Sequence, residues 1–184
     1  EKNRRVSRYI AYATEIYKWF KESYDEKEKA VKTELYSSIN SLFTQMYHGN
    51  RIVEVDDNYR ISLKVRSSSS SSLLRPDTSP GLDTVKNFAF IAGIVDLARK
   101  KAKSSSDFID DSVEYSTEPY PIVMDAPFSN ADETHIARIS KVLPQVAEQV
   151  ILVVMNKDWE YAKTNMSDKV GTVYQIVKQS EIES

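Results

Sequence analysis

The first 47 residues constrain the fold most, because they contain neither glycine nor proline and repeat apolar side chains every three or four positions. That spacing places the apolar side chains along one side of an α-helix. The stripe consists of Val6, Ile10, Ala13, Ile16, Phe20, Val31, Leu35, Ile39, Leu42, Phe43 and Met46. Such a helix would be far longer than an average globular helix, so we expect residues 1–47 to form a coiled-coil stem leading into a globular base.

A second interpretation of this stretch is an ordinary surface helix in two pieces, broken near Ser23, Tyr24 and Asp25, because a strict heptad is not sustained. The chain begins inside the helical pattern without Met and without an evident capping residue. We therefore expect it to be a fragment of a longer protein.

Residues 48–66 have the pattern of a β-hairpin. Apolar and polar side chains alternate over 51–56 and again over 59–65, with Asp57 and Asn58 between them. Residues 67–76 follow as a loop or linker, in which six consecutive serines run from Ser67 to Ser72. Such low complexity is typical of a native mobile loop or of an artificial linker, and the residues do not distinguish the two.

Residues 77–184 alternate helical and strand patterns, which predicts an α/β fold with a largely parallel sheet flanked by helices. The expected elements are a helix over 83–103 capped by Asp83, a strand over 121–125, a helix from 132, a strand over 150–155, a helix over 158–165 and a last strand over 170–177. An acidic loop over 104–118 carries Asp107, Asp110, Asp111 and Glu114, whose spacing favours a solvated loop over a metal site.

The strand at 121–125 carries the first chemical signal, because its apolar run ends on Asp125 and Pro127 follows two residues later. A buried parallel strand delivers such a carboxylate to the carboxyl edge of a sheet, where ligands bind in open α/β folds. An aspartate there commonly holds Mg²⁺ beside nucleotide phosphates. The alternative is a core strand with a polar end.

Four features in order resemble the C-terminal half of the ATP-binding head in SMC-like ABC ATPases, the group that includes double-strand-break-repair and DNA-phosphorothioation ATPases. They are the helical stem, a Ser79-x-Gly81 turn opening a helix, the strand ending at Asp125, and Ser129-x-x-Asp132 before a second strand. The resemblance implies half of an ABC-type P-loop NTPase head. It assigns Ser79 and Gly81 to the signature motif that binds the ATP γ-phosphate, Asp125 to the Walker B Mg²⁺ site and 129–132 to the D-loop.

Three departures from the family pattern stand out. The chain has four glycines and no G-x-x-x-x-G-K-[ST] loop, so ATP binding would need an N-terminal lobe that supplies it. The family's catalytic glutamate position holds Ala126, which leaves three possibilities: an inactivating change, another carboxylate such as Asp132 or Glu133, or a head that binds ATP without hydrolysing it. The family's switch histidine is replaced by Asn156, which can hydrogen-bond a phosphate but cannot titrate. We interpret His48 and His135 as structural.

The resemblance implies a function in which two heads sandwich two ATP molecules and their closure moves the coiled-coil arms. It further implies a second copy of the head, DNA and a nuclease subunit as partners, in the cytoplasm or on the nucleoid. The alternative is a non-enzymatic α/β scaffold that pairs with a partner through its long helix.

The net charge, the absence of cysteine and the length of the apolar runs limit the kinds of site that the chain can have. The formal net charge of −2 gives no reason to expect a general nucleic-acid surface. The absence of cysteine excludes disulfides and thiolate metal sites, and no apolar run reaches the length of a membrane span.

Overall fold

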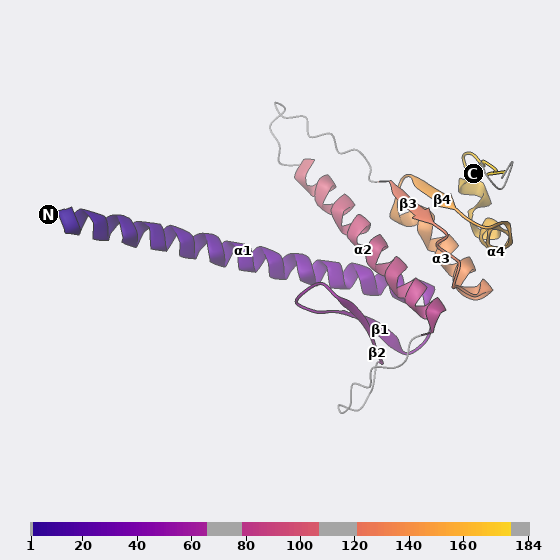
Figure 1. The fold of residues 1–184 in the computed structure, drawn as a ribbon, viewed down its shortest axis with the longest axis horizontal. Helices are drawn as coiled ribbons and strands as arrows, with labels where there is room; N and C mark the ends of the chain where they lie inside the picture. Colours follow the sequence, from indigo (N-terminus) through magenta and orange to yellow (C-terminus); the bar gives the residue numbers. More distant parts are fainter. Residues whose placement is uncertain (1, 66–78, 107–120, 178–184) are drawn as a thin grey trace, which may run out of the picture.

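The computed structural model describes residues 2–65, 79–106 and 121–177, which form a mixed α/β structure with one very long helix (Figure 1). The Ser-rich loop and the acidic loop lie outside the described residues. The elements are α1 (Lys2–Met46), β1 (Arg51–Val55), β2 (Ile61–Val65), α2 (Pro80–Ser106), β3 (Ile122–Asp125), α3 (Glu133–Val146), β4 (Val150–Val153), α4 (Asn156–Met166) and a 3-10 turn (Ser167–Lys169).

Helix α1 is one continuous helix of 45 residues, so the two-piece interpretation is wrong. The charged segment 25–29 consists mainly of Glu and Lys, which favour helix and do not interrupt it. The C-terminal part of α1 packs into the base, where Leu35, Ile39, Phe43 and Met46 are buried. The N-terminal half projects away from the rest of the molecule (Figure 1).

The predicted hairpin is confirmed: β1 and β2 pair antiparallel, with Val53 opposite Leu63 and both side chains buried. Asn40 of α1 fixes the hairpin to the stem. Its side-chain amide donates to the Val53 carbonyl at 2.8 Å, and its side-chain oxygen accepts from the Val53 N–H at 2.9 Å. The base of the stem and the hairpin therefore form one packed unit.

Helix α2 starts earlier than predicted, and its cap is Ser79 rather than Asp83. The Ser79 hydroxyl accepts a hydrogen bond from the Leu82 N–H at 3.3 Å. Pro80 then occupies the first helical position, where its missing N–H has no consequence. Asp83 instead lies in the first turn and forms an ion pair with Lys86 at 2.8 Å.

Strands β3 and β4 pair in parallel, with Ile122 opposite Val150 and Asp125 opposite Val153. The predicted apolar side of α3 is confirmed, because Ile136, Ile139, Val142 and Leu143 are buried. They belong to the same hydrophobic core as Ile122 and Met124 of β3. Within the described ranges this pair is a two-stranded sheet, and the larger parallel sheet that we expected is not seen.

The predicted last strand over 170–177 is wrong, because these described residues belong to no strand. The segment alternates apolar side chains as a strand does, yet Val173, Tyr174, Ile176 and Val177 are all largely exposed. A strand needs a neighbouring strand to satisfy its backbone groups, and β3 and β4 pair only with each other among the described residues. None of the helices described is long and apolar enough to cross a membrane.

Candidate functional site

Asp125 is the last residue of β3 and lies exposed at the carboxyl end of the parallel pair. The chain then turns sharply at Ala126, whose φ of 46° is in the left-handed region. The Ala126 N–H donates to the Val153 carbonyl at 2.9 Å, and the Ala126 carbonyl accepts from the Ser129 N–H at 3.2 Å. Phe128 anchors this turn in the core with 1% exposure. The turn therefore holds Asp125 at a fixed place on the sheet edge.

The N-terminus of α2 packs against this turn. A Cβ atom on Gly81 would lie 3.0 Å from the Asn130 carbonyl oxygen and 3.7 Å from His135 Nδ1. The sequence Ser79-Pro80-Gly81 and the loop 129–132 are thus neighbours in space. The two short motifs that we singled out separately form one surface.

Ser79 is exposed at the start of α2, and its hydroxyl serves as the helix cap. Gly81 is half-buried in the first turn. A helix start carries partial positive charge and backbone N–H groups, which suits a phosphate group. The hydroxyl's role as a cap is compatible with a ligand contact, because a hydroxyl has both donor and acceptor capacity.

Asp132, one of the two predicted substitutes for the missing glutamate, caps α3. Its carboxylate accepts a hydrogen bond from the His135 N–H at 2.8 Å. This backbone hydrogen bond is the main reason that the pKa of Asp132 lies below its ordinary value, and the nearby His135 ring adds to it. His135 Nδ1 lies 3.0 Å from the same carboxylate oxygen but is not aligned for a hydrogen bond, so the contact becomes an ion pair only when the ring is protonated.

Glu133, the other predicted substitute, lies at the first position of α3 and faces α4. A hydrogen bond to Glu133, together with the charge of that carboxylate, raises the pKa of Tyr161. Both acids are therefore exposed near the N-terminus of α3, with Asp132 in a cap and Glu133 beside a phenol.

Asn156 begins α4, with two residues between it and the end of β4, and is exposed. Because β3 and β4 are parallel, the residues that follow them lie at the same sheet edge. Asn156 and Asp125 therefore belong to the same side of the molecule. Sequence reasoning did not find Asp158, which is buried with 6% exposure in the first turn of α4. An acid at a helix start favours helix there, but nothing in the pattern signalled its burial.

The chain alone supplies few ligands for a metal at this edge. The described residues contain no group of three His, Asp or Glu side chains that could hold a metal ion. Asp125 is a hard oxygen donor and fits Mg²⁺ as a single protein ligand, since Mg²⁺ keeps several waters and takes phosphate oxygens as further ligands.

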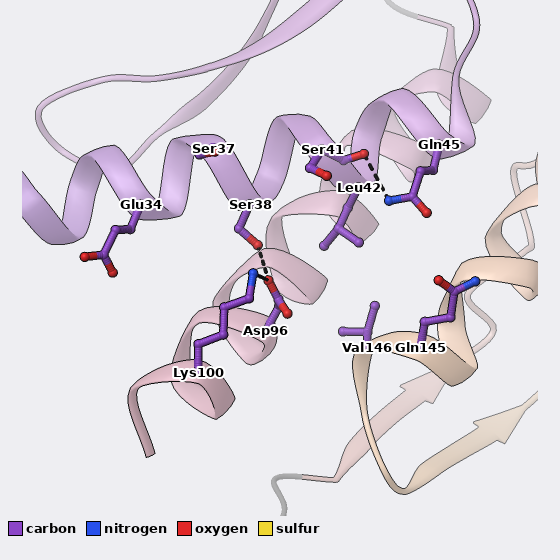
Figure 2. A pocket seen from close by; sticks show the side chains of 10 residues that line it. All are labelled: Glu34, Ser37, Ser38, Ser41, Leu42, Gln45, Asp96, Lys100, Gln145 and Val146. Carbon is purple, nitrogen blue, oxygen red and sulfur yellow. Dashed lines mark hydrogen bonds and ion pairs between the residues drawn. The ribbon is translucent and has the colours of Figure 1, made fainter. Parts of the chain in front are cut away.

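A separate groove of about 540 Å³ lies between α1, α2 and the C-terminal end of α3 (Figure 2). In it, Asp96 accepts hydrogen bonds from Ser38 at 2.7 Å and from Lys100 at 2.6 Å. Partial burial opposes ionisation of Asp96, but these two hydrogen bonds prevail and keep its pKa below the ordinary value. Sequence reasoning missed this cluster, because isolated polar residues on helices give no periodic signal.

This groove is distinct from the sheet edge. Gln145 and Val146 line it at the C-terminal end of α3, whereas Asp132 marks the opposite end of that helix. Within it, the hydrogen bond between Ser38 and Asp96 joins α1 to α2. We therefore take the carboxyl edge of β3 and β4, with the start of α2, as the candidate site. In sequence comparisons, no protein-family model and no curated protein matches the chain.

Proposed function

We propose that the chain is the C-terminal half of an ATP-binding head of the SMC-like ABC type, carried at the base of a coiled-coil arm. The observation that carries the proposal is the contact of Gly81 with Asn130, which joins the start of α2 to the loop after β3. In this proposal the joint surface is the signature turn and D-loop, presented to ATP held mainly by a second head. The bound nucleotide supplies the phosphoryl group for hydrolysis, and Mg²⁺ neutralises its charge.

Each residue of the site has a proposed role. Asp125 holds the Mg²⁺ as its one protein ligand from this chain. Ser79 and Gly81 bind the γ-phosphate through the start of α2, and Asn156 donates a hydrogen bond to the same group from the neighbouring strand end. Of the two acids after the loop, Glu133 is the better base, because Asp132 has a lowered pKa and a capping role.

A missing lobe is supported by the outer face of β3 and β4. Val123 is 66% exposed, and Ile151 and Val153 are also exposed on this parallel pair. Parallel sheets normally have both faces covered. An N-terminal lobe with the P-loop would extend the pair into a larger parallel sheet and cover this face. A second head then completes the ATP sandwich, and arm movement acts on DNA or a nuclease partner.

The proposal is tested by calorimetric titration with ATP. The chain alone should show no saturable binding at millimolar ATP, because it has no phosphate-cradling loop. Joined to the segment that precedes it in its gene, it should bind ATP in a Mg²⁺-dependent way. Asp125→Asn should weaken that binding about tenfold or more, whereas Asp168→Asn, a matched change at an exposed acid, should not. Tight ATP binding by the chain alone, or a parent gene without a P-loop, would refute the proposal.

One observation favours a second candidate function, that of a non-enzymatic scaffold. Ala126 offers no carboxylate next to Asp125, and the long helix offers a large exposed apolar side. In that case the completed protein would bind its partner without any effect of ATP, and Asp125→Asn would change neither partner binding nor nucleotide binding.

A further inference from the structure

The segment 170–177 follows the 3-10 turn and has a strand-forming sequence, but no strand among the described residues pairs with it. Six of its eight residues are Val, Ile, Thr or Tyr, the types that favour strands. Val170 is partly buried against the core, which fixes the start of the segment. The side chains that follow lie in solvent, with Tyr174 87% and Ile176 85% exposed. Such a run of exposed large apolar side chains indicates an interaction surface.

The connection that leads into the segment has the form of a parallel crossover. It consists of residues 154–169, which contain α4 and the 3-10 turn. Parallel strands need a dozen or more residues for such a return, usually with a helix. One unit of this kind already precedes it, because β3 and β4 pair in parallel and α3 connects them. The repeated pattern predicts that the segment, once paired, runs parallel to β4.

Helices α3 and α4 lie on the same face of the β3 and β4 pair. They pack against each other, and their buried side chains share one core with Ile122 and Met124 of β3. On the opposite face, Val123 and Ile151 are exposed. Parallel crossovers are right-handed, so two crossovers with their helices on one face continue in one direction across a sheet. The place of the segment is therefore beyond β4, on the side where α4 lies in Figure 1.

Strand β4 does not pair with the segment, although it is available. In the described part of the chain β3 and β4 pair only with each other, so the outer edge of β4 is open. The segment stays unpaired beside this open edge, which indicates that a further strand is needed between the two. Neighbouring helices lie about 8–10 Å apart, which is about two strand spacings. A helix beside α3 can therefore cover one strand between β4 and the segment.

The rest of this chain is a poor source of that strand. A central parallel strand reads as a near-continuous apolar run. In 66–78, 107–120 and 178–184, no run of apolar residues is longer than two. The outer face of β3 and β4, which we assign to the missing N-terminal lobe, borders the same open edge of β4. The lobe that covers this face is therefore in position to supply the strand.

From these observations we propose that a strand of the missing N-terminal lobe inserts between β4 and the segment 170–177, which becomes the next strand of the completed sheet. The inserted strand then has a backbone partner on each edge, and the lobe covers the exposed side chains of the segment. This chain thus holds the lobe on two sides. The proposal rests on the lobe of the proposed function, but it uses no step of ATP binding or hydrolysis.

The first experiment is hydrogen–deuterium exchange in this chain and in the same chain joined to the segment that precedes it in its gene. In the chain alone, the amides of 171–177 should exchange as in an unstructured peptide. In the joined protein without ATP, their exchange should slow at least about 100-fold. Fast exchange in a joined protein that binds ATP would overturn this proposal and leave the proposed function standing. Slow exchange in a joined protein that does not bind ATP would do the reverse.

The second experiment compares two variants at one position. Tyr174→Pro removes a backbone donor, whereas Tyr174→Val keeps the donor and a strand-favouring side chain. In the chain alone neither variant should change the melting temperature, because Tyr174 is 87% exposed. In the joined protein Tyr174→Pro should lower it by about 5 °C or more, and Tyr174→Val should change it little. Equal melting temperatures of the two joined variants would overturn the pairing.

The third experiment tests the inserted strand. The chain has no cysteine, so Ile151→Cys can be combined with one cysteine moved through positions 171–176, with any cysteines of the lobe replaced. Direct neighbours in a sheet lie about 5 Å apart and can form a disulfide, whereas strands on either side of a third lie about 10 Å apart. In the joined protein we expect no disulfide and a cross-link with a thiol reagent of about 10 Å. A disulfide at any of these positions would show that the segment pairs directly with β4 and would overturn the proposal.

Discussion

Gly81 of α2 lies directly against the backbone of Asn130: a Cβ atom at Gly81 would come within 3.0 Å of the Asn130 carbonyl oxygen. This approach joins the start of α2 to the loop that follows β3, although the two are far apart in the sequence. The two segments are therefore in direct contact. In an ATPase head, such a joint would let the start of α2 and the 129–132 loop respond to a ligand as one surface.

Gly81→Val tests this joint. The branched side chain cannot fit against the Asn130 carbonyl without moving backbone, so the free energy of unfolding should fall by about 1–3 kcal/mol. Urea denaturation measures the loss. Asn87→Val is the control, since it places the same side chain on an exposed side of the same helix and should cost only the smaller helix-propensity difference. An equal loss of unfolding free energy in the two variants would show that the contact between Gly81 and Asn130 leaves room for a larger side chain.

Asp132 should contribute to stability as the cap of α3. Asp132→Ala should lower the free energy of unfolding by about 1 kcal/mol at neutral pH, whereas Asp132→Asn, which also caps well, should lower it less. The pKa of Asp132 is depressed in the folded chain. Its contribution is therefore complete above the ordinary carboxyl pKa and is lost as the pH falls through the lowered one. Urea denaturation at several pH values should show that the difference in unfolding free energy between the native chain and Asp132→Ala shrinks as the pH falls. A difference that stays constant with pH would contradict the carboxylate's role.

Local patterns in the sequence predicted most of the elements correctly. Helical spacing predicts α1 along its whole length, and Leu35 and Ile39 are buried as that spacing requires. The same spacing places Val6 and Ile10 on the stripe, yet these residues are exposed. Periodicity shows that a helix has an apolar side, but it does not show what covers that side.

Where the sequence-based predictions were wrong, a non-local or competing feature decided the outcome. Alternation over 170–177 is typical of a strand, but no strand in the described part of the chain pairs with it. Both Ser79 and Asp83 can cap a helix, and Pro80 at the first helical position favours the earlier start. The contact of Gly81 with Asn130 depends on how α2 docks, which no local pattern encodes.

Ser38 and Asp96 should be energetically coupled across the α1 and α2 interface. The Asp96 carboxylate accepts a hydrogen bond from the Ser38 hydroxyl at 2.7 Å, and Ser38 is buried. Asp96→Ala leaves that hydroxyl without this acceptor and should destabilise the chain by about 1–3 kcal/mol. A double-mutant cycle with Ser38→Ala, followed by urea denaturation, should give a coupling of about 1 kcal/mol. Strictly additive losses would show that the groove's hydrogen bond contributes nothing measurable.

Replacing Ala126 by glycine should make the folded chain more stable. Its φ of 46° lies in the left-handed region, which costs a non-glycine residue about 1–2 kcal/mol. Ala126→Gly removes that strain but raises the conformational entropy of the unfolded chain. The net gain in the free energy of unfolding should therefore be about 0.5–1 kcal/mol. Thermal denaturation measures it. Ala147→Gly is the matched control, because Ala147 has a φ of −131° and should lose stability on the same change. A loss of thermal stability in both variants would contradict the interpretation that the turn at Ala126 is strained.

Ala126 also bears on where the general base would lie in the proposed ATPase head. If Glu133 has taken over that role, Glu133→Ala should lower the steady-state ATPase rate by about 10²–10⁴, and Ala126→Glu should raise it little. If the chain instead carries an inactivated site, Ala126→Glu should raise hydrolysis by the same factor, whereas Ala126→Gln, which has the same shape but no base, should not. Asp132→Asn keeps the helix cap without the carboxylate, so it separates a chemical role of Asp132 from its structural one. We expect the loss at Glu133, because the capping bond and the lowered pKa make Asp132 the weaker base. An active head whose rate changes in none of these variants would show that the base lies outside the loop after β3 and the first turn of α3.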